Sequence, residues 1–578
     1  MRAEVAVRHR SSPVCWRKYH VRGAGIGTLL DVSRWIFRLA VAAPLVLAAP
    51  LAGADLNKEA ADALRQAVEV FRTQVSTGGG YHFQYAEDLS YGRSEHAQGP
   101  TQVSIQRAGT PRVGMAYLEA YEATGDRYYL EAARETAGAL VRGQLCNGGW
   151  DKLIEFDASK RKDYPYRADG PCENRPELDT TLDDNVSQAA LRLMMRVDRE
   201  LGFKDEAIHE ATLFALESLL KAQYPNGAWP QRYVRFPDPA EFPVKRASYP
   251  ETWAREWPGE DYRSHYTLND NTLADMIDAY LEAARIYDQP RYLDVARRGG
   301  DFLLLAQMPD PQPAWAQQYD RDMHPAWARV FEPPSVTGGE SQSAMRVLLT
   351  IYRETGDRKY LEPIPKALAY LKASGLPADP HPPARKARTC PPGTLCLARF
   401  FELHTNRGLF ITRGTMIRVA GGELVRPDGY KVTYDDHHTI THYGMWISGR
   451  PLAAIEADYQ RLSATDPASI RRPARLHGLS PWSGDAAPPK PSDAEVRRIL
   501  DSRDGRGVWV EDGVAGRADR VASVYAAEPM VVRIGGRTIP LPDDATVEVF
   551  RGSAPVVERM IVSETFAKNI EALAAYLR

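Results

Sequence analysis

Two nearly identical segments carry the acidic residues of this sequence that could do chemistry. Thr181-Leu182-Asp183-Asp184-Asn185 returns 86 positions later as Thr267-Leu268-Asn269-Asp270-Asn271. A helix cap would explain one such segment, because Asp and Asn favour helix N-termini. Two copies at one rim would place carboxylates face to face, where they repel unless they bind a hard cation or share protons. We therefore predict that Asp184 and Asp270 act together, as calcium ligands or as an acid/base pair.

Arginines in aromatic, weakly charged surroundings follow these segments. Arg329 lies in Trp327-Ala-Arg-Val-Phe-Glu-Pro, Arg399 in Leu397-Ala-Arg-Phe-Phe-Glu-Leu, and Arg413 in Thr412-Arg-Gly. A lone arginine usually forms a surface ion pair. Three in such contexts favour a site for an anionic ligand, since the planar guanidinium binds carboxylates in a bidentate manner.

Tryptophans close the repeating units of the chain. Gly148-Gly149-Trp150-Asp151 and Gly227-Ala228-Trp229-Pro230-Gln231 both have this form. An indole ring can pack on the apolar face of a sugar, or it can fill the space between two repeats. The sequence leaves both roles open.

These candidate residues belong to a repeat of two helices joined by a short turn. Ala274, Ile277, Leu281 and Ala284 recur at helical spacing. A helix pair cannot bury its apolar face alone, so successive pairs must stack in a solenoid or close into a ring. We predict the ring: a mainly α fold, an α/α-toroid of repeated helix pairs with short β-strands, with the polar loops gathered at one end as a cleft.

The composition changes after residue 376. Residues 377–392 are rich in proline, residues 397–418 resemble strands, and strand-like segments lie between 493 and 556 before a final amphipathic helix. We therefore predict an α/α-toroid catalytic domain over residues 55–450. Residues 451–578 are expected to form a small β-rich extension with a terminal helix, to which the sequence assigns no chemistry.

The N-terminal residues 1–54 have the pattern of a signal peptide with a long, Arg-rich N-region. Arg34 and Arg38 precede an apolar run over residues 39–51, and Ala52-Gly53-Ala54 offers a cleavage site. The run is short for a membrane span, although a retained anchor is the alternative. We predict a secreted or periplasmic protein that begins near Asp55.

Export makes the four remaining cysteines candidates for disulfide bonds. Cys390 and Cys396 flank a tight turn, and Cys146 and Cys172 would bracket a polar loop. A structural zinc site is the competing interpretation, but the spacing of the first pair is poor for zinc.

The overall charge excludes some partners. The chain has 73 basic and 75 acidic residues, a net charge of −2, with 44% hydrophobic and 26% charged residues. Such a balance produces no global field that gathers nucleic acid, so an anionic partner needs a local basic pocket or a metal ion. We expect a monomer that binds no nucleic acid and keeps no membrane span after signal cleavage.

Several strings of the sequence occur in the order found in one family. Gly-x-Trp-Pro-Gln, Asn-Asp-Asn, Gln-Gln-Tyr-Asp, Ala-Arg-x-x-Glu-Pro and Arg-Phe-Phe-x-Leu-x-Thr-Asn-Arg fall within residues 110–415. In these strings the chain resembles the family 10 polysaccharide lyases, which are pectate lyases with an α/α-toroid. The resemblance implies calcium-assisted anti β-elimination of polygalacturonate, an acidic polysaccharide, to 4,5-unsaturated oligogalacturonides.

The resemblance also implies roles for single residues. Asp184 and Asp270 would hold calcium, and Arg329 would remove the C5 proton. The residues implied in substrate binding are Arg399, Arg413, Asn271, Arg232 and Asn185.

Two other functions remain as alternatives. An inverting glycoside hydrolase on the same fold would use Asp184 and Asp270 as acid and base, with the carboxyl groups roughly 6.5–9.5 Å apart. A non-catalytic polyuronate-binding protein would bind the polymer and leave its length unchanged.

Overall fold

The computed structural model describes residues 51–96, 99–106, 108–377, 390, 393–413, 417–418, 424–425, 429–434, 436, 439–440, 443–470, 489–515, 531–534, 537–540 and 556–578. Helix pairs follow one another along this chain: α2 (Thr110–Thr124) with α3 (Arg127–Gly143), α5 (Val186–Glu200) with α6 (Glu206–Lys221), α7 (Thr272–Tyr287) with α8 (Pro290–Ala306), and α9 (Gly338–Thr355) with α10 (Ile364–Ala373).

The turns between paired helices follow from their sequences. Gly125 and Gly356 end α2 and α9 in the left-handed conformation, with φ of 69° and 71°. Glycine adopts this conformation without a steric penalty. Asp126 then caps α3 by accepting a hydrogen bond from the Tyr128 backbone N–H. The same Thr-Gly-Asp sequence therefore stops one helix and starts the next.

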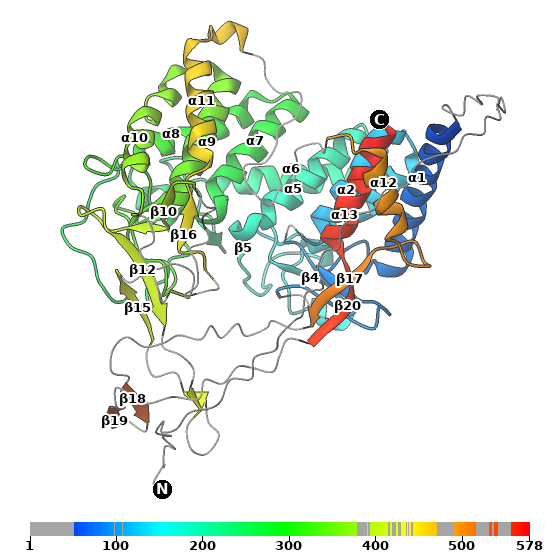
Figure 1. Ribbon diagram of the computed structural model, residues 1–578, viewed down its shortest axis with the longest axis horizontal. Helices are drawn as coiled ribbons and strands as arrows, with labels where there is room; N and C mark the ends of the chain where they lie inside the picture. Colours follow the sequence, from blue (N-terminus) through cyan, green and yellow to red (C-terminus); the bar gives the residue numbers. More distant parts are fainter. Residues whose placement is uncertain are drawn as a thin grey trace, which may run out of the picture.

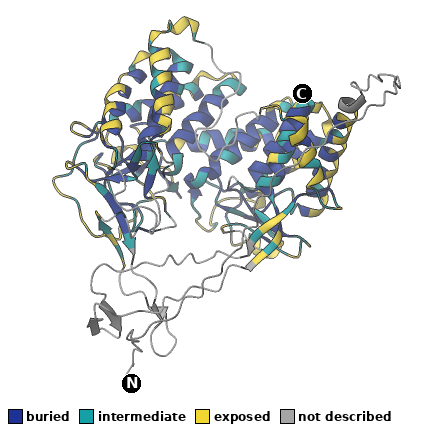
Figure 2. Ribbon diagram, viewed as in Figure 1, coloured by how far each residue is buried: buried dark blue, intermediate teal, exposed yellow. Residues whose placement is uncertain are grey.

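The first helix of each pair forms the inner layer of the molecule. Helices α2, α5, α7 and α9 contact one another in succession, while α3, α6 and α8 cover them from outside. Figure 1 shows the pairs side by side in chain order, and Figure 2 shows that the burial is concentrated on the inner helices. The predicted fold, mainly α with helix pairs in an α/α-toroid and short strands, is confirmed.

Three tryptophans fill the space where each repeat closes. Trp150, Trp229 and Trp315 have no exposed surface. Each indole N–H donates to a carbonyl in the last turns of the preceding outer helix, at Leu140 (2.9 Å), Leu219 (2.8 Å) and Leu303 (2.8 Å). A ring without exposed surface cannot stack on a sugar, so these tryptophans pack the repeats together.

Short strands tie each repeat to the next. β5 (Thr180–Thr181) pairs with β6 (Arg232–Tyr233), and β7 (Tyr266–Thr267) pairs with β8 (Gln318–Tyr319). The register places Thr181 opposite Arg232 and Thr267 opposite Gln318. Both acidic segments are therefore anchored at their first residue by a strand that follows a buried tryptophan.

Further short strands complete the fold around the helix pairs. β9 (Val336–Thr337), β11 (Phe400–Phe401), β12 (Gly408–Arg413) and β15 (Tyr430–Thr433) form one sheet, and the strand pair β10 (Cys396–Ala398) with β16 (Trp446–Ser448) lies beside it. The pair β3 (Gln102–Ser104) with β4 (Leu153–Glu155) lies on the other side of the molecule, near β17 (Val510–Ala515) and β20 (Val556–Val562) in Figure 1. The hairpins β13 (Ile417–Arg418) with β14 (Leu424–Val425) and β18 (Val531–Ile534) with β19 (Arg537–Pro540) are separate.

The C-terminal segment returns to the N-terminal end of the helical layer. α13 (Ser563–Leu577) packs against α2 and α1 (Leu51–Val70), and α12 (Asp493–Asp501) lies beside α1. β20 (Val556–Val562) pairs with β17 (Val510–Ala515) and with β1 (Gln84–Ala86), next to β2 (Gly92–Arg93). The division predicted after residue 450 stays a prediction. Its segment contacts the preceding helices at both ends, because α11 (Pro451–Ala464) packs on α9.

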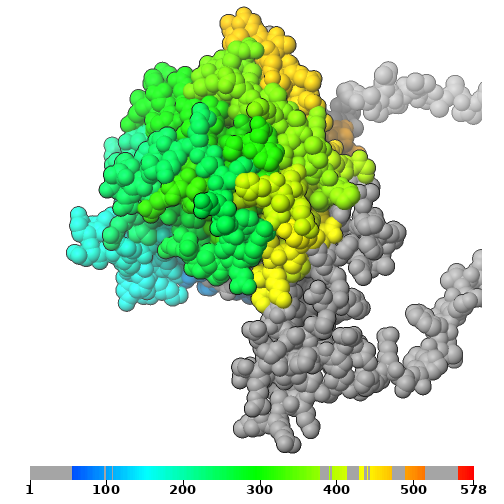
Figure 3. Space-filling view, turned by 90° about the vertical axis from the view of Figure 1, so that its left-hand side faces the viewer, coloured from blue at the N-terminus to red at the C-terminus, as the bar shows by residue number. Residues whose placement is uncertain are grey.

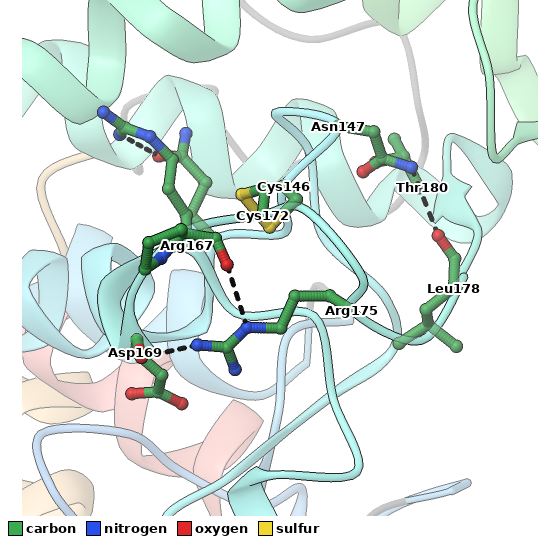
Figure 4. The surroundings of a disulfide bond; sticks show 10 residues. Cys146, Asn147, Arg167, Asp169, Cys172, Arg175, Leu178 and Thr180 are labelled. Atoms are coloured by element: carbon green, nitrogen blue, oxygen red, sulfur yellow. Dashed lines mark hydrogen bonds between the residues drawn. A yellow bond between two sulfur atoms is a disulfide. The ribbon is translucent and has the colours of Figure 1, made fainter.

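Both predicted disulfide bonds are present. Cys146 bonds to Cys172, and Cys390 bonds to Cys396, each with a Cα–Cα distance of 5.7 Å. The first closes the loop shown in Figure 4, where Asn147 donates to the Leu178 carbonyl at 3.2 Å.

The predicted signal peptide falls largely outside the described residues, which begin at residue 51. The backbone of residues 51–54, where we predict cleavage, forms the first turn of α1. No helix among the described residues combines the length and the apolar character that crossing a bilayer needs.

Candidate functional site

The two acidic segments adopt the same unusual backbone. Asp184 and Asn185 have φ of 54° and 56°, and Asp270 and Asn271 have φ of 48° and 60°. A left-handed conformation costs an L-residue about 1–2 kcal/mol, and Asn and Asp tolerate it best. Asn185 and Asn271 occupy the N-cap positions of α5 and α7, but their side chains form no capping hydrogen bond. Helix capping therefore does not explain these segments.

The left-handed turns bring three carboxylates together. Asp183, Asp184 and Asp270 each offer an oxygen, and these oxygens lie within 4.8 Å of one another. The 3-10 turns that carry them, η3 (Asp183–Asn185) and η5 (Asn269–Asn271), are in contact. Burial and the charges of Asp183 and Asp184 raise the pKa of Asp270 to about 8. Asp184 and Asp270 thus meet as the sequence suggested, and Asp183 joins them.

Two cations partly compensate this cluster. The Lys152 Nζ lies 2.9 Å from Asp184 Oδ2 and 3.9 Å from Asp183 Oδ2. Arg232 Nη2 lies 3.2 Å from Asp183 Oδ2. Burial alone would lower the pKa of Lys152, but the charges of Asp184 and Asp183 raise it. Lys152 therefore remains a cation within the cluster.

Sequence reasoning missed Lys152, although the repeat contained a signal. Lys152 follows Trp150 by two positions, as Gln231 follows Trp229. This position contacts the first acidic segment in both repeats: the Lys152 Nζ lies 2.9 Å from Asp184 Oδ2, and the Gln231 carbonyl accepts from the Leu182 N–H at 2.9 Å. A lysine there, where the next repeat has a glutamine, indicates a local need for positive charge.

The donor set of the cluster fits a hard cation. All three side chains supply oxygen, the ligand atom that calcium prefers. Asp183 is buried, and its Oδ1 has no hydrogen-bond partner among the described residues. A buried carboxylate oxygen without a partner costs free energy that a bound cation would offset.

Arg329 lies beside the carboxylate cluster, held by a buried glutamate. Its Nε and Nη2 donate to the Glu332 carboxylate at 2.9 and 2.6 Å, and Glu332 has no exposed surface. The Arg329 Nη2 also lies 3.9 Å from Asp270 Oδ2. Burial alone would lower the pKa of Arg329, but the hydrogen bonds and charge of Glu332 outweigh it and raise that pKa. The guanidinium is therefore held in its charged form.

Tyr443 connects this ion pair to Arg399. Its hydroxyl donates to Glu332 Oε1 at 2.5 Å and accepts from Arg399 Nη2 at 2.8 Å. The Arg399 guanidinium also packs 4.0 Å from the Tyr443 ring centroid and lies 3.3 Å from Glu340 Oε1. Arg399 thus belongs to the network that positions Arg329. No motif of the sequence pointed to Tyr443, which lies 111 residues after Glu332.

The remaining predicted residues are placed less uniformly. Arg232, Asn185 and Asn271 lie in or directly beside the acidic segments. Arg413 is the last residue of β12, opposite Tyr430, and its side chain lies outside the described residues. Tyr262, which the sequence analysis did not select, is half-buried near Arg329 and Glu332. Burial raises the pKa of its phenol, and those two charges also act on it.

Comparisons with known proteins agree with the position of this site. A family model described as pectic acid lyase matches residues 144–437, which include both acidic segments, Arg329, Arg399 and Arg413. A search of curated proteins by sequence finds no match.

Three solved structures resemble the chain at low identity. The family 10 polysaccharide lyase from Cellvibrio cellulosa has a TM-score of 0.40 and 20% identity, covering 60% of this chain and 95% of its own. A mutant of that enzyme in complex with trigalacturonic acid has a TM-score of 0.39 and 19% identity, covering 61% and 98%. A D-mannose isomerase has a TM-score of 0.35 and 12% identity, covering 71% and 98%.

Proposed function

The chain belongs to the pectic acid lyase family, and we propose that it is a secreted or periplasmic lyase that cleaves polygalacturonate by calcium-assisted anti β-elimination. The observation that carries this proposal is the place of Arg329, whose Nη2 lies 3.9 Å from Asp270 in a cluster of three carboxylates. A site for a hard cation thus adjoins a cationic side chain. Elimination from a uronate needs both: the cation binds the uronate carboxylate, and the neighbouring side chain acts on the adjacent C5–H bond.

We assign calcium to Asp184 and Asp270, with Asp183 as a third ligand. Calcium bound there with a uronate carboxylate would acidify the C5–H bond and stabilise the enolate-like charge. The Lys152 ammonium occupies one side of Asp184, so the oxygens of Asp183 and Asp270 and the other Asp184 oxygen are the ligands best able to face the ion.

We assign the removal of the C5 proton to Arg329. The C5–H bond breaks, its electrons form the C4–C5 double bond, and the C4–O bond breaks, leaving an oxygen that takes a proton from water. Arg329 must be neutral to accept the proton. Burial favours the neutral form of Arg329, and Glu332 favours the charged form. Because the neutral fraction of Arg329 grows as pH rises, we expect activity to increase with pH.

Binding of the polymer is assigned to Arg232, Asn185, Asn271, Arg399 and Arg413. The Arg232 side chain is 31% exposed and can reach a uronate carboxylate, whereas the Arg399 side chain is 14% exposed. Arg399 therefore presents only its edge to a substrate, and its second task is to orient Tyr443 and Glu332.

The geometry disfavours an inverting hydrolase. Such enzymes leave roughly 6.5–9.5 Å between their carboxyl groups, so that a water molecule fits between them. The oxygens of Asp184 and Asp270 lie within 4.8 Å, a separation that suits a shared cation.

The test is incubation of polygalacturonate with the protein, with calcium and with a chelator, following the ultraviolet absorbance of the unsaturated product. We expect a calcium-dependent rise that Arg329→Ala abolishes while polymer binding persists. Reducing ends without absorbance would support hydrolysis instead. Binding without any shortening of the polymer would leave a polyuronate-binding protein.

A further inference from the structure

A long loop over residues 234–265, between β6 and β7, is fastened to the segment that carries Arg329. The Trp257 indole N–H donates to the Ala328 carbonyl at 2.8 Å. In return, the Trp327 indole N–H donates to the Ala254 carbonyl at 2.8 Å. These reciprocal hydrogen bonds fix the loop directly beside the proposed catalytic residue.

The loop is held at other points as well. Arg255 Nη1 forms an ion pair with Glu402 Oε1 at 2.5 Å, which links the loop to the turn after β11. Near the other end, the Arg263 carbonyl accepts hydrogen bonds from the backbone N–H groups of Gln231 and Arg232, at 3.1 and 3.2 Å. On the face shown in Figure 3, the green surface of the middle repeats adjoins the yellow surface of the later strands. These contacts fix the loop to the segments on either side of it.

Trp257 differs from the other tryptophans in its exposure. Its exposed fraction is 42%, the largest among the tryptophans that the structure describes, whereas Trp327 is 8% exposed. The only polar atom of its side chain is already hydrogen-bonded to Ala328. What remains toward solvent is apolar ring surface in a fixed orientation, which a binding site can use without ordering a side chain.

We propose that Trp257 is a sugar-stacking platform that binds a galacturonate ring of the polymer beside the ring that is cleaved. The proposal rests on the proposed function and extends it to substrate length. The apolar C–H face of a pyranose packs on an indole, while carboxylate and hydroxyl groups remain at the ring edge. The hydrogen bond to Ala328, one residue before Arg329, places the platform within reach of a neighbouring sugar of the same chain.

Tyr262 supports this placement. It belongs to the same loop, and the charges of Arg329, Glu332 and Arg232 act on its phenol. The loop therefore lies near the proposed reaction centre at two points, Tyr262 and Trp257. A polymer that crosses Arg329 would follow this path.

The first test compares Trp257→Ala and Trp257→Phe with the wild type on di-, tri- and hexagalacturonate with calcium. We expect Trp257→Ala to raise KM by about 3- to 10-fold on the longer oligomers only, the effect of one aromatic contact. Trp257→Phe should retain most of the affinity. Phe203→Ala is the matched control, because Phe203 is 41% exposed and lies outside the loop, between α5 and α6. Equal KM values for Trp257→Ala and wild type at every length would overturn the proposal.

The second test separates the platform from the chemistry. In an Arg329→Ala background, hexagalacturonate should change the tryptophan fluorescence, and the additional Trp257→Phe substitution should remove that change. If the wild type forms no unsaturated product but the fluorescence change depends on Trp257, the proposed reaction fails and the platform stands. If product forms and neither KM nor fluorescence depends on Trp257, the platform fails and the reaction stands. Thermal melting of each variant shows whether it is folded.

Discussion

Arg329 and Glu332 form a two-point ion pair within a single turn, at 2.9 and 2.6 Å, and Glu332 is completely buried. The pair gives Arg329 a fixed orientation and a stabilised charge at the same time. In the proposed reaction Arg329 must be neutral to accept a proton, so Glu332, which positions Arg329, also opposes that step. Removing the charge of Glu332 therefore tests whether Arg329 acts as the base.

Glu332→Gln keeps the shape of the side chain and removes its charge. We expect the pKa of Arg329 to fall, and the rising limb of the pH–rate profile to move to lower pH by about 1–2 units, since a charged hydrogen bond contributes about 1.5–3 kcal/mol. The measurement is the initial rate of unsaturated product between neutral and alkaline pH. Glu340→Gln removes the charge that pairs with Arg399 at 3.3 Å and should shift the limb less, because Glu340 does not pair with Arg329. An unchanged limb in a folded Glu332→Gln protein would exclude Arg329 as the base.

The raised pKa of Asp270 predicts how stability depends on pH without calcium. The folded protein holds the Asp270 proton up to about pH 8, whereas the unfolded chain loses it near pH 4. The folded state therefore binds more protons between these values, and its stability falls as pH rises through this window. In a chelator, the wild type should lose several degrees of melting temperature relative to Asp270→Asn from pH 5 to pH 8. Calcium should restore more stability at pH 8 than at pH 5. Parallel melting curves for the two proteins would contradict the assigned shift.

In the proposed calcium site, Lys152 and the ion would compete for Asp184, because the Lys152 Nζ lies 2.9 Å from Asp184 Oδ2. Lys152→Met removes the charge and keeps much of the volume, so we expect calcium to bind about tenfold more tightly, because the carboxylates lose a compensating charge. The calcium-free variant should be less stable for the same reason. Calorimetric titration measures the affinity, and Lys160→Met serves as the control, since Lys160 is exposed and pairs with Asp157, 3.7 Å away, outside the cluster. Weaker calcium binding in Lys152→Met would show that the lysine helps to build the site.

The C-terminal helix is fastened to α2 through a nearly buried charge. The Arg112 side chain is 5% exposed and pairs with Glu564 at 3.0 Å and with Glu571. Arg112→Ala removes this buried cation, which costs about 3–5 kcal/mol for a buried pair; Glu564 keeps its exposed ion pair with Lys568 at 3.4 Å. Urea unfolding measures the loss. Lys568→Ala, an exposed position on the same helix, should change stability by less than about 0.5 kcal/mol.

The sequence was sufficient for the repeat and for the meeting of Asp184 with Asp270. Equivalent positions in a toroid return to the same rim, so a motif that recurs with the repeat predicts proximity without any coordinates. The turns between paired helices could also be predicted, because Gly125 ends one helix and Asp126 caps the next through contacts within a few residues. The disulfide between Cys390 and Cys396 also followed from close spacing in the chain.

Other features depend on contacts that no local pattern encodes. The sequence allowed Trp150 to be exposed or buried. It is buried because the outer helix α3 packs against it. Tyr443 reaches Glu332 across a large separation in sequence. The terminal helix was recognisable as amphipathic, but amphipathicity does not identify a partner, and α13 returns to α2. Glu332, the ion-pair partner of Arg329, is only three residues away in the sequence, but the strength of the pair comes from the burial of Glu332, which the sequence does not show.

The paired left-handed residues limit what substitutions at the acidic rim can reveal. At Asp184 and Asp270 the backbone itself selects for Asp, Asn or Gly, independently of any ligand. A change to Glu preserves the charge but opposes the local conformation, and a change to Ala alters both at once. Asn is the substitution that removes the charge and leaves the turn in place. Among natural variants, an Asn at either position would mark a chain that kept the architecture of the rim after it lost the need for the ion.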